Sequence, residues 1–176
     1  MRDRGSVKEK DPKWVAVGKR SKAKGDEFER EIAKALTKKF EQDLEEGGEF
    51  RRAPMSGGWS KRLKHTFGDL ITPEWFCFLI SCKNIGKLDI TSVFATKEPL
   101  KVLEKWWDDA VKMAQGASKE PLLIIKIKQK GVVAVLEKNS AMMNGYINGN
   151  IIDCGPRFVI VQWDKLLDVR NFFWRE

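Results

Sequence analysis

The sequence has few cysteines, no long apolar run and no apolar core near its N-terminus. The three cysteines, Cys77, Cys82 and Cys154, are an odd number and lack the spacing of a metal site. We expect them to be buried, reduced thiols of the kind found in cytosolic proteins. The apolar runs are far shorter than the roughly 20 residues that a membrane span needs, and the charged N-terminus does not resemble a signal peptide. These absences argue against a disulfide scaffold, a membrane protein and a secreted protein, and favour a cytoplasmic location.

Length and charge predict one domain with a basic tail. The 176 residues fit a single domain, which we place at 21–176, and 42% apolar residues are enough for a sizeable core. Residues 1–20 are charged and lack periodicity, which predicts a flexible tail. The net charge of +8 is concentrated in two basic blocks, 1–24 and 51–64. Such blocks favour a polyanionic partner such as DNA or RNA, although a solvated surface or tail would have the same composition.

A first helix is predicted to begin at Asp26 and to end at Gly47-Gly48. Asp26 can cap its N-terminus, and Glu29, three residues on, can complete a capping box. Glu29 lies at the edge of the apolar stripe, where it could either reach the sheet end that carries Asp69 or serve only as a capping or solvent-facing residue. The stripe itself has clear helical spacing and consists of Phe28, Ile32, Ala35, Leu36 and Phe40.

The segment from Asp69 to Lys83 predicts a β-hairpin folded at Pro73-Glu74. Its second strand, from about Trp75 to Lys83, is apolar on both faces, which predicts a central strand covered on both sides. The hairpin would bring Asp69 to the same end of the sheet as Lys83. A carboxylate can hold a divalent cation, and an ammonium group can orient water or stabilise developing charge. This pairing is what metal-dependent cleavage of phosphodiesters requires.

The rest of the chain predicts an α/β fold in which a mixed central sheet is flanked by helices. A strand near 49–53 precedes a loop rich in Gly and Ser, 54–60, whose donors could contact phosphates. His65, the sole histidine, is expected at the surface or on DNA rather than as a general base. Later periodicity predicts a helix near 100–114, strands at 122–128 and 132–136, a turn-rich stretch at 139–150, a strand at 158–163 and a short helix at 166–174.

Four motifs in order resemble those of the PD-(D/E)xK nucleases, and in particular the archaeal-type Holliday-junction resolvases and related phage endonucleases. They are residues 24–31, residues 52–58, Gly68-Asp69 and Ser81-Cys82-Lys83, and the similarity spans roughly residues 24–130. The resemblance implies a restriction-endonuclease-like core of order α-β-β-β-α-β and a site for Mg²⁺ or Mn²⁺. For the resolvase branch it further implies a homodimer that cuts branched DNA. If the chain is viral, its location would be the host cytoplasm.

The resemblance also implies roles for particular residues. Asp69 would be the main metal ligand, Glu29 the supporting carboxylate from the first helix, and Cys82 the backbone-carbonyl ligand. Lys83 would position the attacking water or neutralise the scissile phosphate. Ser56 and its loop would contact the phosphate backbone. Together with the neighbouring basic residues they form the predicted DNA-binding set: Arg51, Arg52, Ser56, Gly57, Lys61, Arg62, Lys64 and His65.

Ser81 departs from the family pattern, because it stands where the second carboxylate is expected, two residues before Lys83. A hydroxyl is a neutral and weaker Mg²⁺ ligand than a carboxylate. The acid could have migrated, with Glu74 or Asp89 the nearest candidates in the sequence. Alternatively, the site works with Glu29, Asp69 and water at reduced metal affinity, or the protein binds nucleic acid without cutting it. An engineered serine would have the same appearance.

Overall fold

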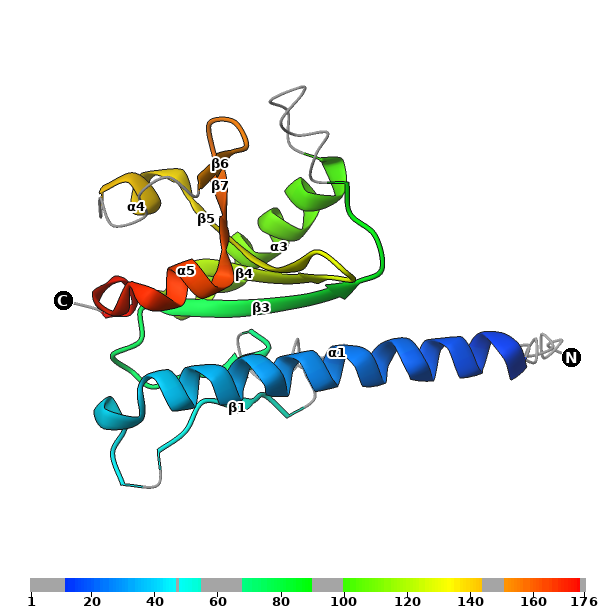
Figure 1. The fold of residues 1–176 in the computed structure, drawn as a ribbon, viewed down its shortest axis with the longest axis horizontal. Helices are drawn as coiled ribbons and strands as arrows, with labels where there is room; N and C mark the ends of the chain where they lie inside the picture. Colours follow the sequence, from blue (N-terminus) through cyan, green and yellow to red (C-terminus); the bar gives the residue numbers. More distant parts are fainter. Residues whose placement is uncertain (1–11, 47, 55–67, 90–99, 144–150, 175–176) are drawn as a thin grey trace, which may run out of the picture.

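A five-stranded mixed sheet forms the centre of the protein, with α1 on one face and α3 on the other (Figure 1). The computed structural model describes residues 12–46, 48–54, 68–89, 100–143 and 151–174. The strand order is β3-β4-β5-β7-β6, in which β3 and β4 are parallel and the other pairs are antiparallel. Parallel neighbours need a crossover, and α3 lies in the connection between β3 and β4. The predicted α/β class with a mixed sheet between helices is confirmed.

The elements have the following bounds. The helices are α1 (Pro12–Lys39), α3 (Lys101–Ala117), α4 (Lys138–Met143) and α5 (Trp163–Asp168), with short 3-10 turns η1 (Glu41–Asp43) and η2 (Arg170–Phe173). The strands are β1 (Arg51–Arg52), β2 (Leu70–Ile71), β3 (Phe78–Ile85), β4 (Glu120–Ile127), β5 (Gly131–Glu137), β6 (Ile151–Asp153) and β7 (Phe158–Gln162). No helix in the described ranges is long and apolar enough to cross a membrane.

Helix α1 starts much earlier than the sequence predicted. It begins at Pro12 rather than at Asp26, so Asp26 is an interior residue and not an N-cap. Proline fits the first turn of a helix, where its missing N–H has no partner to lose. Gly18 and Gly25 lie inside α1, and a Cβ at either would meet nothing within 4 Å. The predicted tail therefore falls partly on α1, and its first eleven residues lie outside the described part of the chain.

The predicted stripe of α1 packs on the sheet with one exception. Phe28, Ile32, Leu36 and Phe40 are buried, whereas Ala35 is half-buried and Ala33 takes a core position. They contact β3 residues Phe78, Ile80 and Cys82 together with aromatic side chains of the C-terminal segment, Phe172 and Phe173. The packing fixes α1 along β3, and this places Glu29, which follows Phe28, against the edge of the sheet.

Strand β3 differs from the predicted hairpin in three ways. It begins at Phe78 instead of Trp75, because Cys77 donates its N–H to the Phe173 carbonyl (3.0 Å) and is thereby paired with η2. It is also the first strand in the sheet order rather than a central one. Its expected partner β2 pairs instead with β1. The burial prediction nonetheless holds, since residues 78–82 are buried on both faces.

The C-terminal half was predicted well apart from two stretches, one of which is the helix expected at 166–174, where the structure has α5 from Trp163 to Asp168 and then η2. Helix α3 and strands β4, β5 and β7 lie where periodicity placed them. The stretch 139–150, expected to form turns, overlaps α4, and β6 follows it. Three-residue β6 is too short to show an alternating pattern, and it is held by pairing with β7. Lys138 at the start of α4 donates to Asp153 Oδ2 of β6 (2.7 Å), so a side-chain contact links the two elements that the sequence did not predict.

Candidate active site

The backbone of Asp69 is fixed between β1 and β3. Its N–H donates to the Ile80 carbonyl (2.9 Å), and its carbonyl accepts from Ala53 N–H (2.9 Å). The preceding Gly68 has φ +89, and a Cβ there would lie 2.9 Å from the Ile80 oxygen. Only glycine fits this left-handed conformation and close approach without a shift. Gly68 therefore lets the chain come close enough to β3 for Asp69 to reach it.

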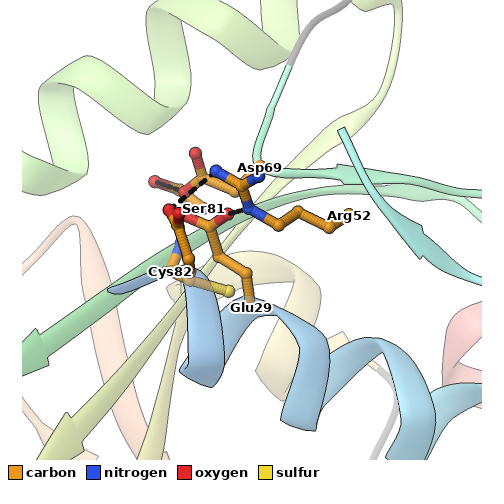
Figure 2. A network of polar contacts seen from close by, with 6 residues as sticks. Glu29, Arg52, Asp69, Ser81 and Cys82 are labelled. Atoms are coloured by element: carbon orange, nitrogen blue, oxygen red, sulfur yellow. Dashed lines mark hydrogen bonds and ion pairs between the residues drawn. The ribbon is translucent and has the colours of Figure 1, made fainter. Parts of the chain in front are cut away.

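The Asp69 side chain is held against the edge of β3 (Figure 2). Its Oδ2 accepts a short hydrogen bond from Cys82 N–H (2.7 Å) and a long one from the Ser81 hydroxyl (3.4 Å). Burial raises the pKa of Asp69 above its usual value, and the Cys82 N–H and the Lys83 and Arg52 charges oppose this rise without cancelling it. The site therefore presents a carboxylate that water solvates poorly, a state that a bound cation would relieve.

Glu29 of α1 points to the same place and is bound by an arginine (Figure 2). Its side chain is only 10% exposed, and its Oε2 accepts from Arg52 Nε at 2.5 Å. The same guanidinium donates from Nη2 to Asp26 Oδ1 at 2.7 Å. Asp26 and Glu29 are three residues apart and so share one face of α1. Arg52, predicted as a DNA contact, thus lies between two acids of α1 and close enough to Asp69 to lower its pKa.

Strand geometry directs the Cys82 carbonyl toward this cluster. The N–H and C=O of one residue in a strand point to the same side, and alternate residues use the same neighbour. The Ile85 carbonyl accepts from Lys128 N–H, just after β4, whereas the Ile80 carbonyl accepts from Asp69 N–H, so the odd-numbered residues of β3 face β4 and the even-numbered ones face Asp69. Cys82 faces the other edge, where its N–H binds Asp69. By the same strand geometry its carbonyl is directed to that edge as well, and its role as a backbone ligand stays a prediction.

The thiol of Cys82 does not add an anionic ligand. Burial raises its pKa well above the usual value, and the nearby Asp69 and Glu29 carboxylates raise it further. The thiol consequently stays protonated at neutral pH, and Cys82 can serve a hard cation only through its backbone oxygen.

Neither proposed replacement for the second acid lies at the site. Ser81 is 2% exposed and its hydroxyl contacts Asp69. Glu74 is exposed in the turn before β3 and lines a different hollow with Asp43 and Glu45. Asp89 lies four residues beyond the end of β3 and is exposed. In the described ranges, no group of three or more His, Cys, Asp and Glu side chains could hold a metal ion.

The donors that do converge still suit a divalent cation. Asp69 and Glu29 supply carboxylate oxygens, Cys82 a carbonyl oxygen and Ser81 a hydroxyl, and Mg²⁺ and Mn²⁺ prefer oxygen ligands. Since Mg²⁺ commonly binds one or two carboxylates and keeps several waters, two acids are sufficient for a weak site. The residues present therefore fit a metal-dependent reaction.

The remaining predicted residues divide into two groups. Arg51 is exposed on β1, and Lys83 is half-buried at the site, where its charge acts on Asp69. Six predicted DNA contacts lie outside the described residues: Ser56, Gly57, Lys61, Arg62, Lys64 and His65. Sequence reasoning missed Asp26 as a partner of Arg52. Its position three residues before Glu29 was the available signal, and the capping interpretation concealed it.

Comparison with protein families agrees with this geometry. A family model described as "Phage putative PDDEXK endonuclease" matches residues 20–162. The chain belongs to this family. The match includes α1 from residue 20 onward, the β1-β2 pair and the sheet through β7, so the PDDEXK endonuclease assignment covers the whole candidate site. It supports the PD-(D/E)xK resemblance without selecting the resolvase branch. No curated protein and no solved structure matches the chain.

Proposed function

We propose that the protein is a Mg²⁺- or Mn²⁺-dependent endonuclease that hydrolyses phosphodiester bonds in DNA. The observation that carries the proposal is the buried Asp69 carboxylate fixed to Cys82 N–H, with Glu29 and the Lys83 charge beside it. Membership of an endonuclease family and the net charge of +8 support a nucleic-acid substrate. When bound, the cation would neutralise phosphate charge and lower the pKa of a coordinated water.

The residues of the chain would divide the work as follows. Asp69 and Glu29 would supply the anionic ligands, and the Cys82 carbonyl would supply a neutral one. Lys83, on the strand after Ser81, would orient the attacking water or stabilise charge on the phosphate. Gly68 and the Ile80 carbonyl would keep Asp69 in place during the reaction, since they fix its backbone.

Two features predict weak cation binding. Ser81 contributes no negative charge, and Arg52 binds Glu29 through its Nε. A cation would have to share Glu29 with the guanidinium or displace it. We therefore expect cleavage to require high Mg²⁺ concentrations, and to be faster with Mn²⁺, which binds such ligands more tightly.

Cleavage assays test the proposal directly. Wild type and Asp69→Ala are incubated with labelled four-way junction, flap and linear duplex, each with Mg²⁺ or Mn²⁺. Loss of the main ligand is expected to lower the rate by more than about 100-fold. If wild type and Asp69→Ala are equally inert on every substrate, the proposed activity is wrong.

Ser81→Asp and Ser81→Glu restore an acid and should raise cation affinity and rate. Because Ser81 is buried, the shorter Asp is the better test.

Branched-DNA selectivity and a homodimer form the finer part of the proposal. They derive from the resemblance to resolvases, since a dimer suits two cuts across a junction. A faster rate on four-way junctions than on linear duplex, together with a dimer mass by sedimentation, would support both. Equal rates on junction and duplex by a monomer would reject them and leave the endonuclease proposal intact.

A second candidate is a nucleic-acid-binding protein on the same fold that no longer cuts. It is favoured by the lack, in the described ranges, of a third His, Cys, Asp or Glu close enough to complete a metal cluster. This candidate predicts salt-dependent DNA binding that is unchanged by Asp69→Ala, and no turnover with any divalent cation. Restoration of cleavage by Ser81→Asp would indicate that the loss of one acid separates the two functions.

A further inference from the structure

A basic groove runs along the outer side of α1 and adjoins the candidate active site. It has a volume of about 610 Å³ and lies between α1 and the segment that leads into β1. Its floor includes Ala33 and Phe50, and Thr37 joins its two walls by accepting from Phe50 N–H (3.0 Å) and donating to the Phe50 carbonyl (3.3 Å). This double hydrogen bond fixes the width of the groove at that point.

Cations line the groove at regular spacing. Arg30, Lys34 and Lys38 recur every four residues on one exposed stripe of α1, and Arg51 of β1 is also among the lining residues. With a rise of about 1.5 Å per residue, the three α1 side chains start about 6 Å apart along the helix axis. Among the residues described, none of these four cations forms an ion pair. Like charges four residues apart weaken a helix, so packing and helix stability do not explain this arrangement.

The groove leads to the candidate site through Arg52. Arg52 lines the groove and at the same time binds Glu29 and Asp26, and its charge acts on Asp69. At the other end the groove meets Glu41 and Glu49. A polyanion would therefore be attracted over the stretch from Arg30 to Lys38 and repelled beyond it. The charge pattern therefore favours a polyanion that lies along α1 from the candidate site as far as Lys38.

We propose that this groove binds the sugar-phosphate backbone of DNA on one side of the cleavage position, through Arg30, Lys34, Lys38 and Arg51. The inference rests on the proposed function for the position of the cut, and it assigns binding to α1 residues outside the predicted DNA-binding set. Phosphate contacts of this kind position a duplex without reading its sequence. Binding through the groove is consequently sequence-independent and salt-dependent.

Two matched triple variants test the groove. Arg30→Ala/Lys34→Ala/Lys38→Ala removes three charges from the groove. Lys101→Ala/Lys105→Ala/Lys112→Ala removes three exposed charges from α3, on the opposite face of the sheet. Affinity for a fluorescein-labelled duplex is measured without divalent cation over a range of salt concentrations. Each lost phosphate contact lowers the slope of log affinity against log salt by about 1. The slope of the groove variant should therefore fall by about 3, and its affinity should fall roughly tenfold or more. The α3 variant should keep the slope and affinity of the wild type. Equal slopes for both variants would overturn the proposal.

Lysine footprinting gives a second readout that does not depend on variant folding. Wild type is acetylated with and without duplex DNA, and modification at each lysine is followed by mass spectrometry. Lys34 and Lys38 should be protected by DNA, whereas Lys101 and Lys105 should not. Lack of protection at Lys34 and Lys38 under saturating DNA would reject the groove. Since both assays omit the divalent cation, groove binding without cleavage would reject only the proposed function, and cleavage without groove binding would reject only this inference.

Discussion

Helices α1 and α3 cover opposite faces of the same sheet, yet they bury different kinds of side chain (Figure 1). Helix α3 buries only apolar residues, namely Leu103, Trp107, Ala110 and Ala114. Helix α1 buries a comparable stripe and, next to Phe28, also Glu29, the one charged residue that is buried in the described part of the chain. Burying a carboxylate costs free energy, and an apolar side chain at this position would pack without that cost. The difference supports the proposed role of α1 in the candidate site, whereas α3 buries core residues alone.

The largest expected effect on stability is on the α3 side. Trp107 is 2% exposed and packs against Phe158 with ring centroids 5.6 Å apart. Trp107→Ala should lower the free energy of unfolding by about 3–5 kcal/mol, because it leaves a cavity in the core. Urea denaturation followed by circular dichroism measures the change. A loss below about 1 kcal/mol would mean that the α3 face is not a tightly packed core.

Removal of Arg52 should have the next largest effect. Arg52→Ala deprives Glu29 and Asp26 of the guanidinium that binds them, and should cost about 1–3 kcal/mol. In a Glu29→Gln background the same change should cost less, since the buried charge is gone. A double-mutant cycle by urea denaturation measures this coupling. Additive effects would show that the Arg52–Glu29 contact does not stabilise the fold.

Replacement of Asp69 should have a smaller effect on stability, and it should stabilise the protein rather than destabilise it. Burial raises its folded-state pKa above the unfolded value, so its contribution to stability is full below the unfolded pKa and is lost as pH rises through the folded pKa. Asp69→Asn keeps an acceptor for Cys82 N–H without the charge. At neutral pH and without divalent cation it should be more stable than wild type, and the difference should vanish at acidic pH. Melting temperatures across this range provide the measurement, and a less stable Asn variant at neutral pH would contradict the account.

The smallest expected effect is on the reactivity of the buried thiols, Cys82 and Cys154, which lie on opposite faces of the sheet. Cys82 lies on the α1 side with a pKa well above the usual value, and burial raises the pKa of Cys154, on the α3 side, to about 11. Neither should react with iodoacetamide in the folded protein at neutral pH. Peptide mapping after alkylation tests this. Glu29→Gln should lower the Cys82 pKa slightly and leave Cys154 unchanged, because Glu29 contributes only to the former.

The sequence predicted the elements whose pattern is long and regular, and it failed where contacts outside the segment decide. The stripe from Phe28 to Phe40, helix α3 and the β4-β5 pair follow from periodicity alone. The start of β3 does not, because Cys77 pairs with Phe173, almost a hundred residues away. The start of α1 was missed because Asp26 and Glu29 were interpreted as a capping box and the charged residues before them lack an apolar period, although α1 continues through them from Pro12.

Part of the candidate site was predictable, because some of its residues stand in motifs whose order and spacing are visible in the sequence. Ordered motifs indicated Glu29, Asp69 and Lys83, and Figure 2 shows Glu29 and Asp69 directed to one place. The role of Arg52 was not predictable, since it depends on how β1 lies beside α1. Basic composition suggested a DNA contact, whereas its guanidinium binds Asp26 and Glu29. Composition alone therefore does not reveal that a basic residue also binds acids of the candidate site, and the DNA contact of Arg52 stays a prediction.

Calorimetric titration with Mn²⁺ tests the central claim most directly, because it reports whether Asp69 and Glu29 hold a divalent cation together. Wild type should bind one Mn²⁺ weakly, Asp69→Asn should lose binding, and Glu29→Gln should weaken it, while a change on the α3 side such as Lys105→Ala should leave it intact. Identical titrations for wild type and Asp69→Asn would contradict the account.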